Sequence, residues 1–150
     1  MIRTRPLRAD DQAEWRRLWT GYLTFYNTTV PEVVYASTFA RLLGSDPRDF
    51  NGLIAEADGR AIGLTHFLFH RHGWKIEDTC YLQDLYVDPA ARGTGAGRAL
   101  IEAVYAAADA AGAPSVYWLT QDFNAEARRI YDRVGQLTPF IRYNRPQKAR

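Results

Sequence analysis

The segment DPAARGTGAGRAL combines three alternating glycines, an arginine and the start of an alanine-rich helix. Gly93, Gly95 and Gly97 let backbone N–H groups turn inward, because glycine has no Cβ and tolerates positive φ. Such N–H groups at a helix N-terminus can bind a phosphate or pyrophosphate, and Arg92 adds a positive charge. Two familiar phosphate-binding motifs are excluded. A dinucleotide fingerprint would need a glycine in place of Arg98, and a P-loop would need Gly-Lys-Ser/Thr, which the segment lacks. The alternative is a tight strand-to-helix turn without a ligand.

The segment TCYLQDLYV, directly before this loop, carries a carboxylate inside a predicted strand. A carboxylate in that position can take a proton from a reacting group, directly or through water. Strand alternation predicts that Asp84 shares a face with Leu82 and Tyr86, and that Gln83 lies on the other face. Asp84 and Gln83 are therefore not expected to face the same ligand.

The remaining sequence supplies the elements that must position these groups. An aromatic stripe at helical spacing predicts a first helix, with Asp10 or Asp11 as its N-cap. The stripe comprises Trp15, Leu18, Trp19, Tyr22 and Tyr26. The last two could also lie at the edge of a groove that binds a substrate. Further helices are expected between Pro31 and Gly44, from the glycine loop to Gly112, and from Asn124 to Gly135. Strands are expected at 3–8, on both sides of Asp58-Gly59, and at 79–87, 115–120 and 137–144.

This order predicts one domain over residues 1–150 with an α/β (mixed α+β) fold. The crossover from 79–87 through the alanine-rich helix to 115–120 predicts a parallel, right-handed βαβ unit inside a central mixed, mostly antiparallel sheet. Helices are expected on both faces of that sheet. The glycine loop then lies at the carboxyl end of its strand, where open α/β sheets bind ligands.

The loop and its surroundings resemble the GNAT superfamily of N-acetyltransferases, whose coenzyme A loop reads Arg/Gln-x-x-Gly-x-Gly/Ala. The corresponding residues are Arg92, Gly93, Thr94, Gly95, Ala96 and Gly97. The flanking runs YLQDLYVDP, SVYWLT and DFNAEARRIYDRVG strengthen the match and are most similar to the polyamine, thialysine and histone acetyltransferase branch. The resemblance is strong over residues 78–135 and rests on element order over residues 1–77.

The resemblance implies acetyl-CoA as the donor and a primary amine as the acceptor: a polyamine, a lysine-like small molecule or a protein lysine. It implies that the amides from Gly93 to Arg98 hold the pyrophosphate. It implies that the backbone of Leu85, Tyr86 and Val87 lines the pantetheine arm of the donor and polarises the thioester carbonyl. It also implies coenzyme contact by Asn124 and protonation of the departing thiolate by Tyr131, which would otherwise be interpreted as a helix cap and a core aromatic.

The proton route departs from the family pattern, because the polyamine branch commonly has Glu-Asp where this chain has Gln83-Asp84. Four possibilities stay open: Asp84 is the base, Asp84 holds a relay water, Asp84 binds the acceptor's ammonium, or Gln83 positions the water. Glu77 and Asp78 are further carboxylates nearby, which a solvated strand end also explains.

Composition narrows the function classes. The net charge of +2 and the absence of a basic run argue against a nucleic-acid partner. No apolar run approaches the ~20 residues of a membrane span, and the N-terminus lacks a signal-peptide core, so a cytoplasmic location is expected.

Cys80 is the sole cysteine and is not expected to be a nucleophile. No metal site is expected from His66, His70 and His72. A homodimer is expected from the family and an uncovered sheet edge. The alternative to an enzyme is a non-catalytic acyl-CoA-binding regulatory module.

Overall fold

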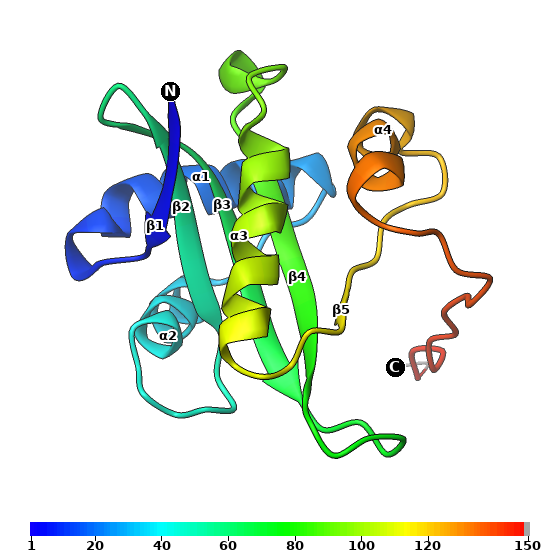
Figure 1. The fold of residues 1–150 in the computed structure, drawn as a ribbon. Coiled ribbons are helices and arrows are strands. Elements are labelled where there is room, and N and C mark those ends of the chain that lie inside the picture. Colours follow the sequence, from blue (N-terminus) through cyan, green and yellow to red (C-terminus); the bar gives the residue numbers. More distant parts are fainter. Residues whose placement is uncertain (149–150) are drawn as a thin grey trace. The chain divides into compact units, whose positions relative to one another are not determined.

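The computed structural model describes residues 1–148, which form two compact parts, 1–120 and 121–148 (Figure 1). The first part contains β1 (Ile2–Pro6), η1 (Ala9–Asp11), α1 (Gln12–Phe25), α2 (Glu32–Leu42), β2 (Asn51–Ala57), β3 (Arg60–His70), β4 (Thr79–Val87), η2 (Pro89–Ala91), α3 (Ala96–Ala110) and β5 (Val116–Tyr117). The second part contains α4 (Ala125–Val134). No helix in residues 1–148 has the length and apolar character needed to cross a membrane.

The sheet has the order β1-β2-β3-β4-β5, with antiparallel neighbours except for the parallel pair β4–β5. The predicted hairpin is confirmed: Asp58 and Gly59 connect β2 to β3 with φ of 51° and 76°, as the two-residue turn requires. The edge strand β1 ends at Pro6, which has no N–H to offer a further partner. The sheet is therefore mixed and mostly antiparallel, as predicted.

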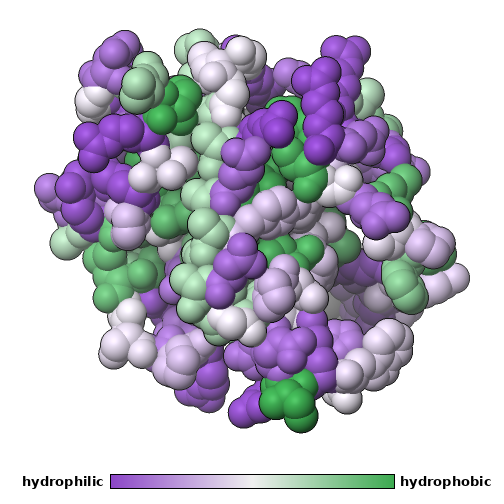
Figure 2. Space-filling model, in the orientation of Figure 1, coloured by the Kyte–Doolittle hydropathy of each residue, from purple (hydrophilic) through white to green (hydrophobic). Residues whose placement is uncertain are grey.

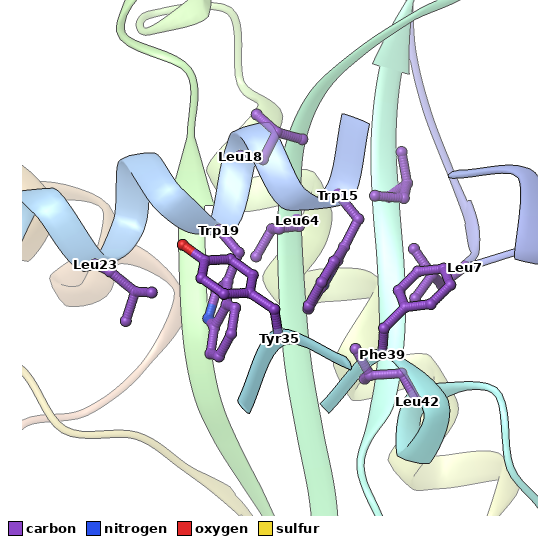
Figure 3. Close-up of a cluster of buried hydrophobic side chains, with 10 residues drawn as sticks. Leu7, Trp15, Leu18, Trp19, Leu23, Tyr35, Phe39, Leu42 and Leu64 are labelled. Carbon is purple, nitrogen blue, oxygen red and sulfur yellow. The ribbon is translucent and has the colours of Figure 1, made fainter. Parts of the chain in front are cut away.

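Helices cover both faces of the sheet (Figure 1). Buried side chains of α1 and α2 pack with Ile54 and Leu64 on one face (Figure 3), and α3 packs with Ala55 on the other. Ile54 and Ala55 are consecutive residues and both are fully buried, as expected for a strand between two layers. Complete burial of a side chain as large as that of Ile54 contributes about 1.5–3 kcal/mol. Polar side chains cover most of the face that carries α3 (Figure 2).

Two predicted strands differ in the structure. The strand expected at 115–120 is reduced to Val116–Tyr117, and residues 137–144 form no strand at all. Within 137–144, Pro139 removes a backbone donor from the ladder, and the large apolar side chains stay exposed instead of covering a sheet face. The strand prediction for 137–144 is therefore wrong.

The expected N-cap of α1 also has a different role. Asp11 stands at the cap position without a side-chain cap bond. Its carboxylate receives two hydrogen bonds from Arg5, each 2.8 Å long. Asp11 therefore ties β1 to the start of α1 through a bidentate ion pair.

Candidate active site

The glycine loop forms the N-terminal cap of α3. Gly93 and Gly95 adopt φ of 81° and 89°, the left-handed region in which a side chain would be strained. The first helical hydrogen bond runs from the Ala99 N–H to the Gly95 carbonyl, at 3.0 Å. The amides from Gly95 to Arg98 precede it and have no acceptor inside the helix. The loop therefore presents N–H groups at the positive end of the α3 dipole, as an anion site requires.

Side chains of the loop hold its shape and add charge. Thr94 Oγ1 donates a hydrogen bond of 2.6 Å to the Ala91 carbonyl, so the turn is closed on itself before α3 begins. Arg92 is exposed ahead of the glycines. The residues predicted to bind a pyrophosphate thus lie on one continuous turn.

The strand edge before the loop is open towards β5. Pairing between β4 and β5 is confined to Cys80–Val116 and Tyr81–Tyr117. The Asp88 N–H donates to the Ile62 carbonyl at 2.8 Å, and the register pairs Tyr86 with Leu64. In an antiparallel ladder the residues between such positions turn their N–H and C=O groups away from the partner strand. The backbone groups of Leu85 and Val87 therefore face away from β3, along an edge that no strand of residues 1–148 pairs with.

A β-bulge changes the predicted faces of β4. Consecutive residues His66 and Phe67 of β3 pair with Asp84 and Leu82, so Gln83 has no partner in β3. Because His66 and Phe67 point to opposite faces, Asp84 and Leu82 do so as well. The expectation that Leu82 shares a face with Asp84 is wrong. Gln83 is exposed at the bulge.

Asp84 lies in a buried hydrogen-bonded chain that sequence reasoning missed. His66 Nδ1 is 2.8 Å from Asp84 Oδ2, and Trp15 Nε1 donates to His66 Nε2 at 2.9 Å. Trp15, His66 and Asp84 are 1%, 3% and 6% exposed, respectively. About a twelfth of the Asp84 side chain, 8 %, remains exposed, which leaves the carboxylate within reach of a ligand or water. A histidine inside the apolar run AIGLTHFLF was the available signal, but its partner could not be derived without the β3–β4 register.

Two phenol groups at the C-terminal end of α1 lie near the carboxylate. Burial, the negative charge of Asp84 and a hydrogen bond to it raise the pKa of Tyr22 above its usual 10.0. Burial and the same charge raise the pKa of Tyr26. Tyr81 also acts electrostatically on Tyr22 and stacks on Tyr117 with ring centroids 4.8 Å apart. The phenols of Tyr22 and Tyr26 therefore stay protonated at neutral pH.

The remaining candidates from the sequence are two further carboxylates, the single thiol and the possible metal ligands. Glu77 is exposed and Asp78 lies 3.9 Å from Arg71, both ahead of β4. Burial raises the pKa of the Cys80 thiol to about 11, so that it is not a ready nucleophile. Within residues 1–148, no group of three His, Cys, Asp or Glu side chains is arranged to hold a metal ion.

Asn124 and Tyr131 belong to the second compact part. Asn124 Oδ1 accepts a hydrogen bond of 3.4 Å from the Ala127 N–H and caps α4. Tyr131 is in the second turn of the same helix, and its carbonyl accepts the Gly135 N–H at 2.7 Å. The helix and its Gly135 end are confirmed, whereas coenzyme contact by Asn124 and proton donation by Tyr131 stay predictions.

Comparison with known proteins identifies relatives over nearly the whole chain. The model of the acetyltransferase (GNAT) family matches residues 12–136. D-amino-acid N-acetyltransferase HPA3 of Saccharomyces cerevisiae is 37% identical over 145 residues, which cover 96% of this chain and 90% of the relative. The uncharacterized N-acetyltransferase YhfO of Bacillus subtilis is 35% identical over 143 residues, 93% of each chain.

Solved structures share the fold at low sequence identity. AAC(6')-Iy in complex with the bisubstrate analogue CoA-S-monomethyl-acetylneamine superposes with a TM-score of 0.84 at 20% identity, covering 99% of both chains. The aminoglycoside acetyltransferase meta-AAC0020, from an uncultured soil metagenomic sample and in complex with trehalose, gives a TM-score of 0.81 at 16% identity. That match covers 98% of this chain and 97% of the other.

Proposed function

The chain belongs to the acetyltransferase (GNAT) family of N-acetyltransferases, and we propose that it transfers the acetyl group of acetyl-CoA to a primary amine, with Asp84 receiving the amine's proton. The observation that carries the proposal is the order of groups along one strand. The buried Asp84 carboxylate comes first, the outward-facing backbone of Leu85 and Val87 follows, and the glycine loop lies just beyond. This order supports the proposal, because a proton acceptor and a donor-binding surface would then be next to each other.

The donor site is proposed from groups that fit a pyrophosphate and an extended thiol arm. The amides at the α3 N-terminus and Arg92 would hold the diphosphate. The approach is open at Gly93 and Gly95, where an added Cβ would meet no described atom within 4 Å beyond the neighbouring residues of the chain. The Leu85 and Val87 backbone would bind the arm along the open edge of β4. Acetyl-CoA supplies the acetyl thioester.

The proton balance assigns one task to each titratable group. An Asp84 oxygen takes one proton from the acceptor's ammonium, so that the free amine nitrogen can form the new C–N bond as the C–S bond breaks. Tyr131 Oη is proposed to give a proton to the departing sulfur, and the second proton of the amine restores that hydroxyl. Asp84 then releases its proton to solvent, which matches the net loss of one proton in the overall reaction.

The acceptor is proposed to enter as a cation. The phenol rings of Tyr22 and Tyr26, with centroids 5.1 Å apart, lie near the Asp84 charge, and aromatic faces attract ammonium groups. This environment suits a cationic acceptor: a polyamine, a lysine-like amine or a lysine side chain, as in the polyamine, thialysine and histone branch. The relative that acts on D-amino acids adds a fourth class, in which a carboxylate accompanies the amine.

Thiol release from acetyl-CoA, measured against diamines, lysine analogues, basic peptides and D-amino acids, tests the proposal. Turnover with one class and not with matched N-acetylated controls is expected. Binding of acetyl-CoA without turnover on any amine would contradict the enzyme and favour the acyl-CoA-binding module.

A homodimer is also proposed, since the two-residue β5 leaves most of a sheet edge without a strand partner in the described residues. Light scattering at micromolar concentration, with and without acetyl-CoA, is the measurement. A monomer in both conditions would remove the dimer from the proposal.

A further inference from the structure

The hydrogen-bonded chain behind Asp84 has a defined direction. An indole N–H can only donate, so His66 Nε2, which lies 2.9 Å from Trp15 Nε1, must be the accepting nitrogen. Nδ1 then carries the imidazole hydrogen and donates it to Asp84 Oδ2 over 2.8 Å. The contacts therefore select one tautomer of His66, with both ring nitrogens in use.

Three elements bring this chain together. Trp15 and Tyr22 are seven residues apart on α1 and so lie on one helix face. His66 comes from β3 and Asp84 from β4, opposite each other beside the bulge. Trp15 and His66 are 51 residues apart in the sequence, and His66 and Asp84 are 18 residues apart. The arrangement therefore exists only in the folded protein.

We propose that Trp15 and His66 are positioning residues for Asp84: the Trp15 N–H holds His66 in its neutral Nδ1–H form, and His66 holds the carboxylate in place to receive the acceptor's proton. This inference rests on the proposed function. A neutral imidazole donates a hydrogen bond without adding a positive charge. An imidazolium at the same distance would attract the carboxylate's negative charge and weaken it as a proton acceptor.

Trp15 is the group that prevents a second proton from binding to His66 at Nε2. In residues 1–148, the phenols of Tyr22 in α1 and of Tyr26, directly after α1, interact electrostatically with Asp84, and the phenol of Tyr81 in β4 interacts with Tyr22. None of these is a cation. Trp15 Nε1 occupies the nitrogen on which a proton would have to bind, and two N–H groups cannot point at each other across 2.9 Å.

Trp15→Phe tests the block, and the neighbouring tryptophan provides a matched control. Trp19 is also buried and stacks on Trp15 at 5.2 Å, but its Nε1 finds no hydrogen-bond partner among residues 1–148. Trp15→Phe therefore removes a hydrogen bond together with indole packing, whereas Trp19→Phe removes packing alone.

Two measurements are made on both variants and on the wild-type chain. Nitrogen-15 NMR of the three histidines reports the protonation of each ring nitrogen and needs no substrate. At pH 6, we expect an unprotonated His66 Nε2 in wild type and in Trp19→Phe, where Trp15 donates to this nitrogen, and a proton on it in Trp15→Phe. In kcat/KM against pH, Trp15→Phe should match Trp19→Phe at pH 8.5 and fall about tenfold below it at pH 6, the effect of roughly one unit of lost basicity.

Substitutions of His66 separate positioning from simple support. His66→Asn keeps an N–H donor near the Nδ1 position and should retain kcat within about tenfold, whereas His66→Leu should lose most of kcat with unchanged affinity for acetyl-CoA. A protonated Nε2 in the wild-type chain, or identical pH profiles for Trp15→Phe and Trp19→Phe, would overturn the inference. Wild-type chain that acetylates no amine would overturn the proposed function instead, and the NMR result would still decide whether Trp15 controls the tautomer.

Discussion

Asp84→Asn tests the central step of the proposed mechanism with little change in shape. The amide oxygen of asparagine can still accept the His66 Nδ1–H that now spans 2.8 Å, so the buried pair keeps a hydrogen bond. The variant loses only the negative charge and the ability to take a proton. We therefore expect a folded protein with unchanged affinity for acetyl-CoA.

The size of the effect follows from the amine. A lysine-like ammonium has a pKa of ~10.4, so forming the free amine at pH 7 costs roughly 4.6 kcal/mol. A positioned base commonly contributes ~10²–10⁴ in rate, and kcat/KM should fall by that factor at pH 7. The free amine increases about tenfold per pH unit below its pKa. The variant should therefore recover by up to ~100-fold between pH 7 and pH 9, where the wild type gains less.

The assay is thiol release from acetyl-CoA at saturating donor, with kcat and KM for the amine determined separately from pH 6.5 to 9.5. Asp78→Asn is the matched control, because Asp78 is a half-exposed carboxylate directly ahead of the same strand. Normal turnover of Asp84→Asn across pH 7 to 9 would refute its role as proton acceptor. An increase in KM with unchanged kcat would also refute it, and would assign Asp84 to binding the acceptor's ammonium.

Four further predictions address other parts of the protein. Gln83→Glu should be tolerated or activating in the same assay, because the bulge leaves this side chain exposed and a carboxylate there restores the pattern of related enzymes. Arg92→Glu should abolish the melting shift that acetyl-CoA produces, which corresponds to about 2.7 kcal/mol at a hundredfold excess over its Kd; an unchanged shift would contradict the anion site. Tyr131→Phe should reduce kcat with little effect on acetyl-CoA affinity if chemistry is rate-limiting, and a normal kcat would leave the residue merely structural. The hydrogen bonds from Arg5 lower the pKa of Asp11 below its usual 3.8, so the stability that this pair contributes is present above pH 4 and lost as pH falls through the folded value; urea titrations from pH 5 to 2.5 should show a smaller loss in Asp11→Asn than in wild type.

Local features of this protein were predictable from its sequence because they depend on neighbouring residues. Gly93 and Gly95 take the positive φ that only glycine adopts easily, and the turn ends in a helix whose start the glycines mark. Asp58-Gly59 forms its hairpin, and Asn124 caps α4 through an atom three residues away. In each case the interacting groups lie within a few residues, so the order of residues specifies the geometry.

Tertiary structure decided which side chains meet at the candidate site. The contact between His66 and Asp84 depends on the β3–β4 register, and the bulge at Gln83 shifts that register by one residue, which moves side chains to the opposite face. Trp15 reaches His66 only because α1 packs across the same face of the sheet. The strand expected at 137–144 was wrong for the converse reason: its apolar residues match a strand, but a strand forms only where another edge pairs with it. Residue order carries propensity and periodicity, whereas register and packing partners are selected by the free energy of the whole fold.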